Sequence, residues 1–167
     1  YPISYYGRSK LEAENIIRGS LNPYCILRAS VLYGHPLNNK SNFFSWVYNS
    51  LSQNRYISVA MDQISNPSWT VNFSEAILEI ILKNITGVFH YGSSDYLNRF
   101  EFSILIAEVF GFDQKFINRV SSNELPLLAK RPLNSGLFTN KINNTIGLTM
   151  VDTKDSLNFI KNKMKLT

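Results

Sequence analysis

Two short apolar runs constrain the fold of this chain more than any other feature, because they are its two strong sheet strands. They are Tyr24–Val31 (YCILRASV) and Val88–Tyr91 (VFHY), and neither alternates strictly between apolar and polar residues. Helical patterns alternate with them, which predicts an α/β protein with parallel pairing. A parallel sheet needs cover on both faces and several neighbouring strands. We therefore expect this chain to be the C-terminal part of a larger, doubly wound parallel sheet.

Hydrophobic periodicity and helix-end signals place the remaining elements. We predict helices from the start of the chain to Gly19 and over 42–51, 75–82, 99–110, 139–146 and 152–164, with short strands over 57–60 and 69–71. Asn72 or Ser74 would cap the helix over 75–82, and Gly111 would end the helix over 99–110. Residues 62–67 are expected to form a turn.

Two side chains within the first predicted strand need an explanation. Arg28 is its only charge, so we expect it either to lie near the sheet edge or to pair with a carboxylate. Cys25 lies in an apolar run, which favours a small buried side chain over a reactive thiol. As the only cysteine in 167 residues, it also excludes an internal disulfide and a multi-cysteine metal site. A reducing, cytoplasmic location is the default expectation.

Composition narrows the class of partner. The hydrophobic content of 44% argues against disorder, and no apolar run is long enough for a membrane span. We also expect no secretory leader and no metal site, since no ligand cluster has suitable spacing. The net charge of +5 would suit nucleic acid, a solvated basic helix or an anionic small molecule. Because the basic residues are dispersed except near the C-terminus, we expect no nucleic-acid partner.

The first predicted helix carries a tyrosine four residues before a lysine, Tyr6 and Lys10. Positions i and i+4 lie on one face of a helix, about 5–6 Å apart at Cβ. An ammonium held beside a phenol stabilises the phenolate, so the pair has the arrangement of a general acid–base. The same spacing also occurs in ordinary contacts on a helix surface, so its interpretation depends on the rest of the chain.

Several motifs in order resemble those of extended short-chain dehydrogenases, and in particular the dTDP-4-dehydrorhamnose reductases. The matching segments are Y-G-R-S-K from Tyr6 with Glu14, R-A-S-V-L-Y-G from Arg28, N-P-S from Asn66, G-V-F-H-Y-G from Gly87 with Glu101, and R-P-L-N-S-G-L from Arg131 with Lys141. Together they cover the chain from its first residue to about position 159. The resemblance implies residues 1–33 and 73–91 as Rossmann-type elements, with 34–72 and 92–167 mainly a small α/β substrate-binding lobe.

The resemblance also implies roles for individual residues. Tyr6 would protonate the C4 oxygen of a nucleotide-linked 4-keto-deoxysugar while NADPH or NADH delivers hydride. Lys10 would hold the nicotinamide ribose, and Ala29, Ser30 and Val31 would lie beside the nicotinamide. Val31 would also face the substrate. Arg131 would contact the diphosphate, although a plain surface charge is the alternative for this residue.

One feature of these reductases is missing from the sequence. The glycine-rich turn that binds the cofactor pyrophosphate occurs nowhere in these 167 residues. We therefore expect residues 1–167 alone not to bind the cofactor stably, and the first half of the enzyme to be trimmed, supplied by another chain or lost. A homodimer is a further possibility.

A second function remains open at this point. Another branch, resembling the beta subunit of methionine adenosyltransferase, retains the tyrosine and lysine while acting as a regulatory or binding subunit. Val31 stands where the reductases often have an aromatic residue, which favours this alternative or a different substrate. A remnant that cannot fold is the third possibility.

Overall fold

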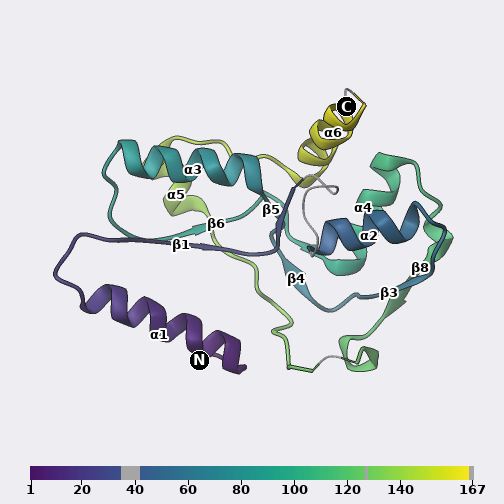
Figure 1. The fold of residues 1–167 in the computed structure, drawn as a ribbon, viewed down its shortest axis with the longest axis horizontal. Helices are drawn as coiled ribbons and strands as arrows, with labels where there is room; N and C mark the ends of the chain where they lie inside the picture. The colour runs from purple at the N-terminus through teal and green to yellow at the C-terminus, as the bar shows by residue number, and fades with distance from the viewer. Residues whose placement is uncertain (35–41, 127, 166–167) are drawn as a thin grey trace.

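The computed structural model describes residues 1–34, 42–126 and 128–165 and has two regions (Figure 1). Its helices are α1 (Tyr5–Gly19), α2 (Phe43–Leu51), α3 (Thr70–Leu82), α4 (Arg99–Phe110), α5 (Asn140–Ile146) and α6 (Thr153–Met164). Its strands are β1 (Cys25–Ala29), β2 (Leu32–Tyr33), β3 (Ile57–Ala60), β4 (Ile64–Ser65), β5 (Ser68–Trp69), β6 (Gly87–Tyr91), β7 (Leu97–Asn98) and β8 (Ile117–Val120). The segment directly after Gly34, which the resemblance assigns to the substrate lobe, lies outside the described residues.

The first region is built on a parallel pair of strands, β1 and β6, in which Cys25 lies opposite Gly87 and Ala29 opposite Tyr91. Side chains alternate between the two faces of a strand. Cys25, Leu27 and Ala29 accordingly pack on one face with the core under α3 and α5. Arg28 reaches α1 on the other face, so helices lie on both sides of this pair (Figure 1).

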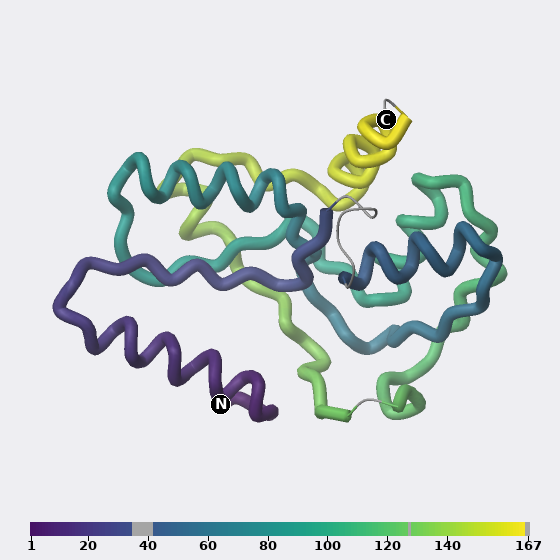
Figure 2. The backbone as a smooth tube through the Cα atoms, in the orientation of Figure 1, coloured from purple at the N-terminus to yellow at the C-terminus, as the bar shows by residue number. Residues whose placement is uncertain are grey.

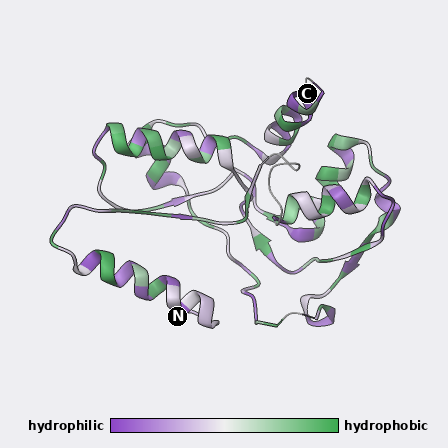
Figure 3. Ribbon diagram, viewed as in Figure 1, coloured by the Kyte–Doolittle hydropathy of each residue, from purple (hydrophilic) through white to green (hydrophobic). Residues whose placement is uncertain are grey.

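The second region contains the larger core. Strands β3 and β8 pair in parallel, and α2, α4 and α6 pack around them. Tyr33, Phe43, Phe44 and Phe102 form edge-on and stacked ring contacts at its centre, with centroids 5.2 to 5.9 Å apart. Aromatic side chains of this size bury large apolar areas, and both α2 and α4 carry hydrophobic residues (Figure 3).

The chain passes between the two regions several times (Figure 2), through short strand pairs. Strand β2 pairs in parallel with β5, and β4 pairs antiparallel with β7. Asn66, which is 1% exposed, ties three of the connecting segments together. Its side chain donates to the carbonyl of Ser93 at 3.3 Å and accepts from the backbone N–H of Leu137 at 2.6 Å. Gly92 lies so close to Asn66 that a Cβ would come within 2.5 Å of its side chain.

Most of the predicted elements are confirmed, with shifts of one or two residues at their ends. The helix predicted over 75–82 instead begins five residues earlier, at Thr70. The first strand is shorter than predicted, ending at Ala29 rather than Val31, and Gly111 ends α4 in the left-handed conformation with φ 78°. The parallel pairing of the two strong strands and the α/β class are also confirmed. Arg28 pairs with the carboxylate of Glu14, which is one of the two environments predicted for it.

Three local predictions are wrong. The strand over 69–71 ends at Trp69, because Thr70 begins α3 without any side-chain cap. Neither Asn72 nor Ser74 caps this helix, since both lie inside it. The buried Asn72 amide accepts from the Tyr91 hydroxyl at 2.6 Å and donates to Glu75, and the Ser74 hydroxyl donates to the Thr70 carbonyl. Residues 62–67 are not only a turn, since Ile64 and Ser65 form β4. Each of these three local structures depends on contacts with residues that are distant in the sequence.

Candidate active site

Helix α1 begins with a capped turn that places Tyr6 and Lys10 on one face. Ser4 is its N-cap, and the Ser4 hydroxyl accepts from the backbone N–H of Gly7 at 3.2 Å. The Lys10 ammonium lies 5.4 Å from the centroid of the Tyr6 ring. The two side chains are therefore neighbours, and the Tyr6 ring is 71% exposed, which leaves it accessible to a small molecule.

The end of β1 lies close to this tyrosine. Ala29 is the last residue of the strand, and Ser30 and Val31 follow it as a bend. Val31 has φ of 49°, an uncommon conformation for a β-branched residue. Its carbonyl accepts from the backbone N–H of Ser68 at 3.0 Å, which holds the strained position in place. Strain of this kind is often found at functional sites.

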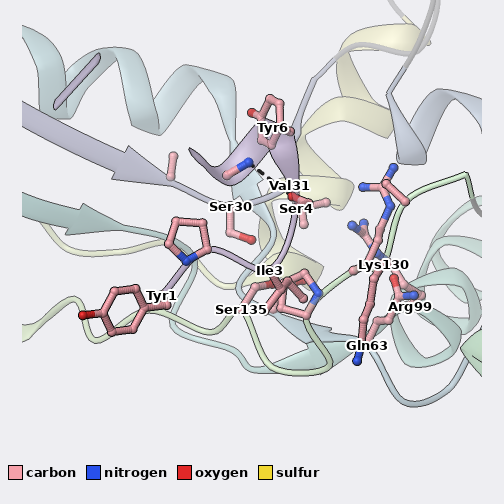
Figure 4. A pocket seen from close by; sticks show the side chains of 17 residues that line it. Tyr1, Ile3, Ser4, Tyr6, Ser30, Val31, Gln63, Arg99, Lys130 and Ser135 are labelled. Atoms are coloured by element: carbon pink, nitrogen blue, oxygen red, sulfur yellow. Dashed lines mark hydrogen bonds between the residues drawn. The ribbon is translucent and has the colours of Figure 1, made fainter. Parts of the chain in front are cut away.

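Tyr6, Ala29, Ser30, Val31 and Arg131 all line one cleft of about 790 Å³ (Figure 4). The structure thus brings together the predicted site residues from α1, the β1 end and the segment near 131. Lys10 does not line the cleft, and its ammonium lies over the Tyr6 ring instead. Further lining residues that sequence reasoning missed include Gln63, Ser65, Arg99, Lys130 and Ser135.

A small sheet explains why these distant residues meet. Ile64 in β4 lies opposite Asn98 of β7, and it also bridges to Asn134. The backbone of Ile64 donates to the Leu133 carbonyl at 2.7 Å and accepts from Ser135 at 2.9 Å. This pairing sets the segment that carries Arg131 beside β4. The same pairing brings Arg99, the residue directly after β7, to the cleft.

Arg99 has the most unusual environment in the cleft. Its guanidinium carbon lies 4.6 Å from the centroid of the Phe43 ring, and its Nη1 is buried without a hydrogen-bond partner among the described residues. Burial, with the charge of Arg131 as a second cause, lowers the pKa of Arg99 to about 10. An unsatisfied buried donor costs about 1–3 kcal/mol, and more when it is charged. The only sequence signal was a cation at the start of a helix rich in apolar residues.

An ion pair holds α1 against the sheet. Arg28 donates to both carboxylate oxygens of Glu14, at 2.7 and 2.6 Å, and its guanidinium also lies 3.3 Å from His90 Nε2. The hydrogen bond from Arg28 lowers the pKa of the Glu14 carboxyl, and burial lowers the pKa of His90. Because this pair links α1 to β1, it helps set the position of Tyr6 relative to the β1 end.

Other predicted side chains take structural positions. Trp69 packs on Phe159, with ring centroids 5.0 Å apart. Glu101 completes a capping box with Asn98 at the start of α4. Cys25 is half-buried, and burial raises the pKa of its thiol. Within the part of the chain that the structure describes, no three His, Cys, Asp or Glu side chains cluster as metal ligands would.

The same described ranges contain no helix that combines the length and the apolar character needed to traverse a lipid bilayer.

The chain resembles curated reductases along most of its length. The probable low-salt glycan biosynthesis reductase Agl14 of Haloferax volcanii is 30% identical over 158 residues, covering 93% of this chain and 53% of that protein. A dTDP-4-dehydrorhamnose reductase of Aggregatibacter actinomycetemcomitans is 28% identical over 173 residues, covering 96% and 58%. The chain spans about half the length of the curated relatives that it matches.

A solved structure and a methionine adenosyltransferase subunit extend this comparison. The dTDP-4-dehydrorhamnose reductase of Bacillus anthracis, crystallised with NADP, superposes with a TM-score of 0.89 at 26% identity, covering 98% of this chain and 57% of that one. This similarity confirms the predicted Rossmann-type α/β fold. The methionine adenosyltransferase 2 subunit beta of Danio rerio is 22% identical over 161 residues, covering 91% of this chain and 49% of that protein.

One family accounts for nearly the whole chain. Residues 1–165 match the family described as the RmlD substrate binding domain. The relatives named dTDP-4-dehydrorhamnose reductase agree with that match in sequence and in fold. The chain therefore belongs to the RmlD substrate-binding domain family, which confirms the resemblance indicated by its motifs.

Proposed function

We propose that this protein takes part in the NAD(P)H-dependent reduction of the 4-keto group of a nucleotide-linked deoxysugar. The observation that carries the proposal is that Tyr6, with Lys10 beside it, shares one cleft with the end of β1 and with Arg131. An accessible phenol next to an ammonium is suited to donate a proton to a carbonyl oxygen. The relatives named reductases, one of them crystallised with NADP, support the same reaction class.

The residues present fit one end of a dinucleotide. Tyr6 and the residues from Ala29 to Val31 line the cleft where a nicotinamide would lie, and Lys10, next to the Tyr6 ring, would hold the adjoining ribose hydroxyls. NADPH or NADH would supply the hydride. The pyrophosphate has no glycine-rich turn in this sequence, so we predict that residues 1–167 alone do not bind the cofactor tightly.

The proton step follows from the positions of Tyr6 and Lys10. When the keto group is reduced, the Tyr6 hydroxyl would transfer its proton to the C4 oxygen, which would become the alcohol. The Lys10 ammonium stabilises the phenolate that remains. Ser4 and the Glu14–Arg28 pair contribute by fixing where α1 begins and how it lies on the sheet.

The substrate side of the proposal uses the second region. Residues 34–72 and 92–167 would mainly form the substrate lobe, and residues 1–33 and 73–91 the cofactor side. Arg131, exposed at the cleft, would bind the substrate's diphosphate, since a guanidinium matches phosphate oxygens with two donors. The cytoplasmic location and a homodimeric state remain predictions.

Replacing Tyr6 by Phe tests the proposal directly. We expect Tyr6→Phe to reduce turnover by roughly 10²- to 10⁴-fold, the usual contribution of a positioned general acid. The measurement, made with the glycine-rich cofactor-binding half supplied, is the loss of NADPH absorbance with a dTDP-linked 4-keto-deoxysugar. Tyr5→Phe is a matched control, because Tyr5 is the adjacent exposed tyrosine and does not line the cleft. Full turnover by Tyr6→Phe would overturn the proposed chemistry.

The alternative is a regulatory or binding subunit, supported by the similarity to the methionine adenosyltransferase 2 subunit beta. Lys10→Ala separates the two functions. A reductase should lose turnover, whereas a binding subunit should hold its partner with unchanged affinity. Pull-down of a methionine adenosyltransferase by wild-type and Lys10→Ala protein to the same extent, together with no reduction of a 4-keto sugar, would favour the alternative.

A further inference from the structure

Arg99 presents donors to the cleft that the described residues leave unused. A guanidinium carries five N–H donors and no acceptor. The described part of the chain gives Arg99 the Phe43 ring at 4.6 Å, but neither a carboxylate nor any acceptor for its buried Nη1. A buried charge without a counter-ion is unfavourable. The arrangement is therefore incomplete without an anion.

The neighbouring side chains add positive charge. Lys130 and Arg131 line the same cleft, and burial, followed by the charge of Arg131, lowers the pKa of Arg99. No Asp or Glu lines the cleft, and the described residues form no ion pair with any of these three cations. Figure 4 shows Arg99, Lys130 and Gln63 grouped at one end, away from Tyr6. Like charges gathered without a counter-ion attract phosphate groups.

The start of α4 adds to the positive potential at this end of the cleft. Arg99 is the first residue of the helix, where the dipole is positive, so its cation is placed where an anion would be favoured. The capping box already uses the backbone N–H groups of Asn98 and Glu101, which bond to each other's side chains at 2.8 and 2.9 Å. The donor available to a ligand at this position is the guanidinium.

We propose that Arg99 is a specificity-determining residue that binds the diphosphate of the nucleotide-linked substrate together with Lys130 and Arg131. The inference rests on the proposed function for the identity of the substrate. It adds a buried contact to the exposed Arg131. An anion held at this end of the cleft would direct the attached sugar toward Tyr6, because both residues line the same cavity. Substrates without a diphosphate would lose this contact.

Binding measurements on three ligands test the proposal without requiring turnover. Inorganic pyrophosphate, dTDP and NADPH are titrated by calorimetry into wild-type protein, Arg99→Gln and Arg99→Lys. We expect Arg99→Gln to raise Kd for pyrophosphate and dTDP by about 10- to 100-fold, the range for a charge-assisted hydrogen bond. NADPH binding, which we expect to be weak for residues 1–167 alone, should be unchanged where it is measurable. Arg99→Lys keeps the positive charge but loses the paired donors of the guanidinium. Its Kd values for pyrophosphate and dTDP should therefore lie between those of wild-type protein and Arg99→Gln.

Arg55→Gln is the matched control, since Arg55 is exposed and does not line the cleft. It should leave all three Kd values unchanged. Thermal unfolding of each variant establishes that it is folded, and Arg99→Lys serves if Arg99→Gln is not. Unchanged Kd for pyrophosphate and dTDP in the folded variant would overturn the inference. An equal loss for NADPH would also overturn it, because the anion would then belong to the cofactor.

Turnover separates this inference from the proposed function. If wild-type protein reduces no 4-keto sugar but binds dTDP through Arg99, the reaction is wrong and the anion site stands. If the protein is an active reductase and Arg99→Gln leaves both Kd for dTDP and KM unchanged, the reaction stands and the anion site is wrong.

Discussion

The two regions of the molecule differ in how completely they bury their apolar side chains. Among the described residues, the core around β3, β8 and α4 contains thirteen that are buried, against seven in the core under α3. Helix α1 buries none, and α3 exposes an apolar face made of Ile77, Leu78, Ile81 and Leu82. The β1–β6 sheet has only two described strands, which is too narrow to bury the apolar sides of the helices on both of its faces.

The residues of the proposed site also divide between these two regions. The proposed proton donor lies on α1, which depends on an ion pair for its position, whereas Arg99 and Arg131 belong to the compact region and its attached segment. The cations are therefore attached to the region with the larger core, whereas the tyrosine lies on a helix that has no buried residues. The predictions below test whether stability and site geometry follow this division.

Removing a ring from the compact core should have the largest effect. Phe102 is 1% exposed and packs on Tyr33 and Phe43. We expect Phe102→Ala to lower the free energy of unfolding by about 3–5 kcal/mol, from lost burial and the cavity left behind. Chemical denaturation measures this change. Leu78→Ala on the exposed face of α3 is the control and should cost less than about 1 kcal/mol. Equal losses would contradict the asymmetry.

Asn66 lies where the regions join, so its loss should affect both. Asn66→Ala removes the acceptor for Leu137 and the donor to Ser93 in a buried setting. We expect a loss of about 1–3 kcal/mol, because buried partners are left unsatisfied. Hydrogen exchange should show faster opening around residue 137. Ser94→Ala, an exposed neighbour, should change neither quantity. A loss of stability without faster exchange there would show that Asn66 does not secure this segment.

The sequence predicted what local patterns determine. The helix from Tyr5 to Gly19, the parallel strands and the Tyr6–Lys10 pair follow from spacing and from capping residues close in the chain. Arg28 was recognised as needing a partner because a charge within an apolar strand is unfavourable.

The missed features depend on contacts between distant residues. Strand β4 exists because Ile64 pairs with Asn98 and Asn134, and no local pattern indicates that pairing. Arg99 was read only as part of a helix, since its burial against Phe43 and its proximity to Arg131 arise from folding. Asn72 looked like a helix cap because its partner Tyr91 is nineteen positions away.

Breaking the tie between α1 and β1 should loosen one region and spare the other. Glu14→Gln leaves Arg28 without its counter-ion, and we expect a loss of about 1–2 kcal/mol, since the Arg28 side chain is 39% exposed and partly screened. Amide exchange should rise in α1 and stay unchanged in α4. Arg18→Gln removes only the exposed ion pair between Arg18 and the same carboxylate, and it should lower the free energy of unfolding by less than about 0.5 kcal/mol. Equal exchange in both helices would contradict this role.

Acid should weaken the same tie, with the smallest effect from His90. Burial, and then the charge of Arg28, lowers the pKa of His90 from 6.5, so neutral His90 contributes stability above pH 6.5 that is lost as pH falls toward the folded value. Glu14 behaves likewise in a lower window. Its carboxylate contributes stability above its ordinary pKa of 4.5, and this contribution is lost as pH falls through the depressed value.

Unfolding free energies measured from pH 7 to pH 3 separate the two groups. His90→Gln should flatten the slope just below pH 6.5, and Glu14→Gln the slope below pH 4.5. The first change should be smaller, because His90 is half-buried and bears no ion pair, whereas Glu14 accepts two hydrogen bonds from Arg28. If His90→Gln instead removed most of the acid sensitivity, the histidine rather than the Glu14–Arg28 pair would be the main link between α1 and the sheet.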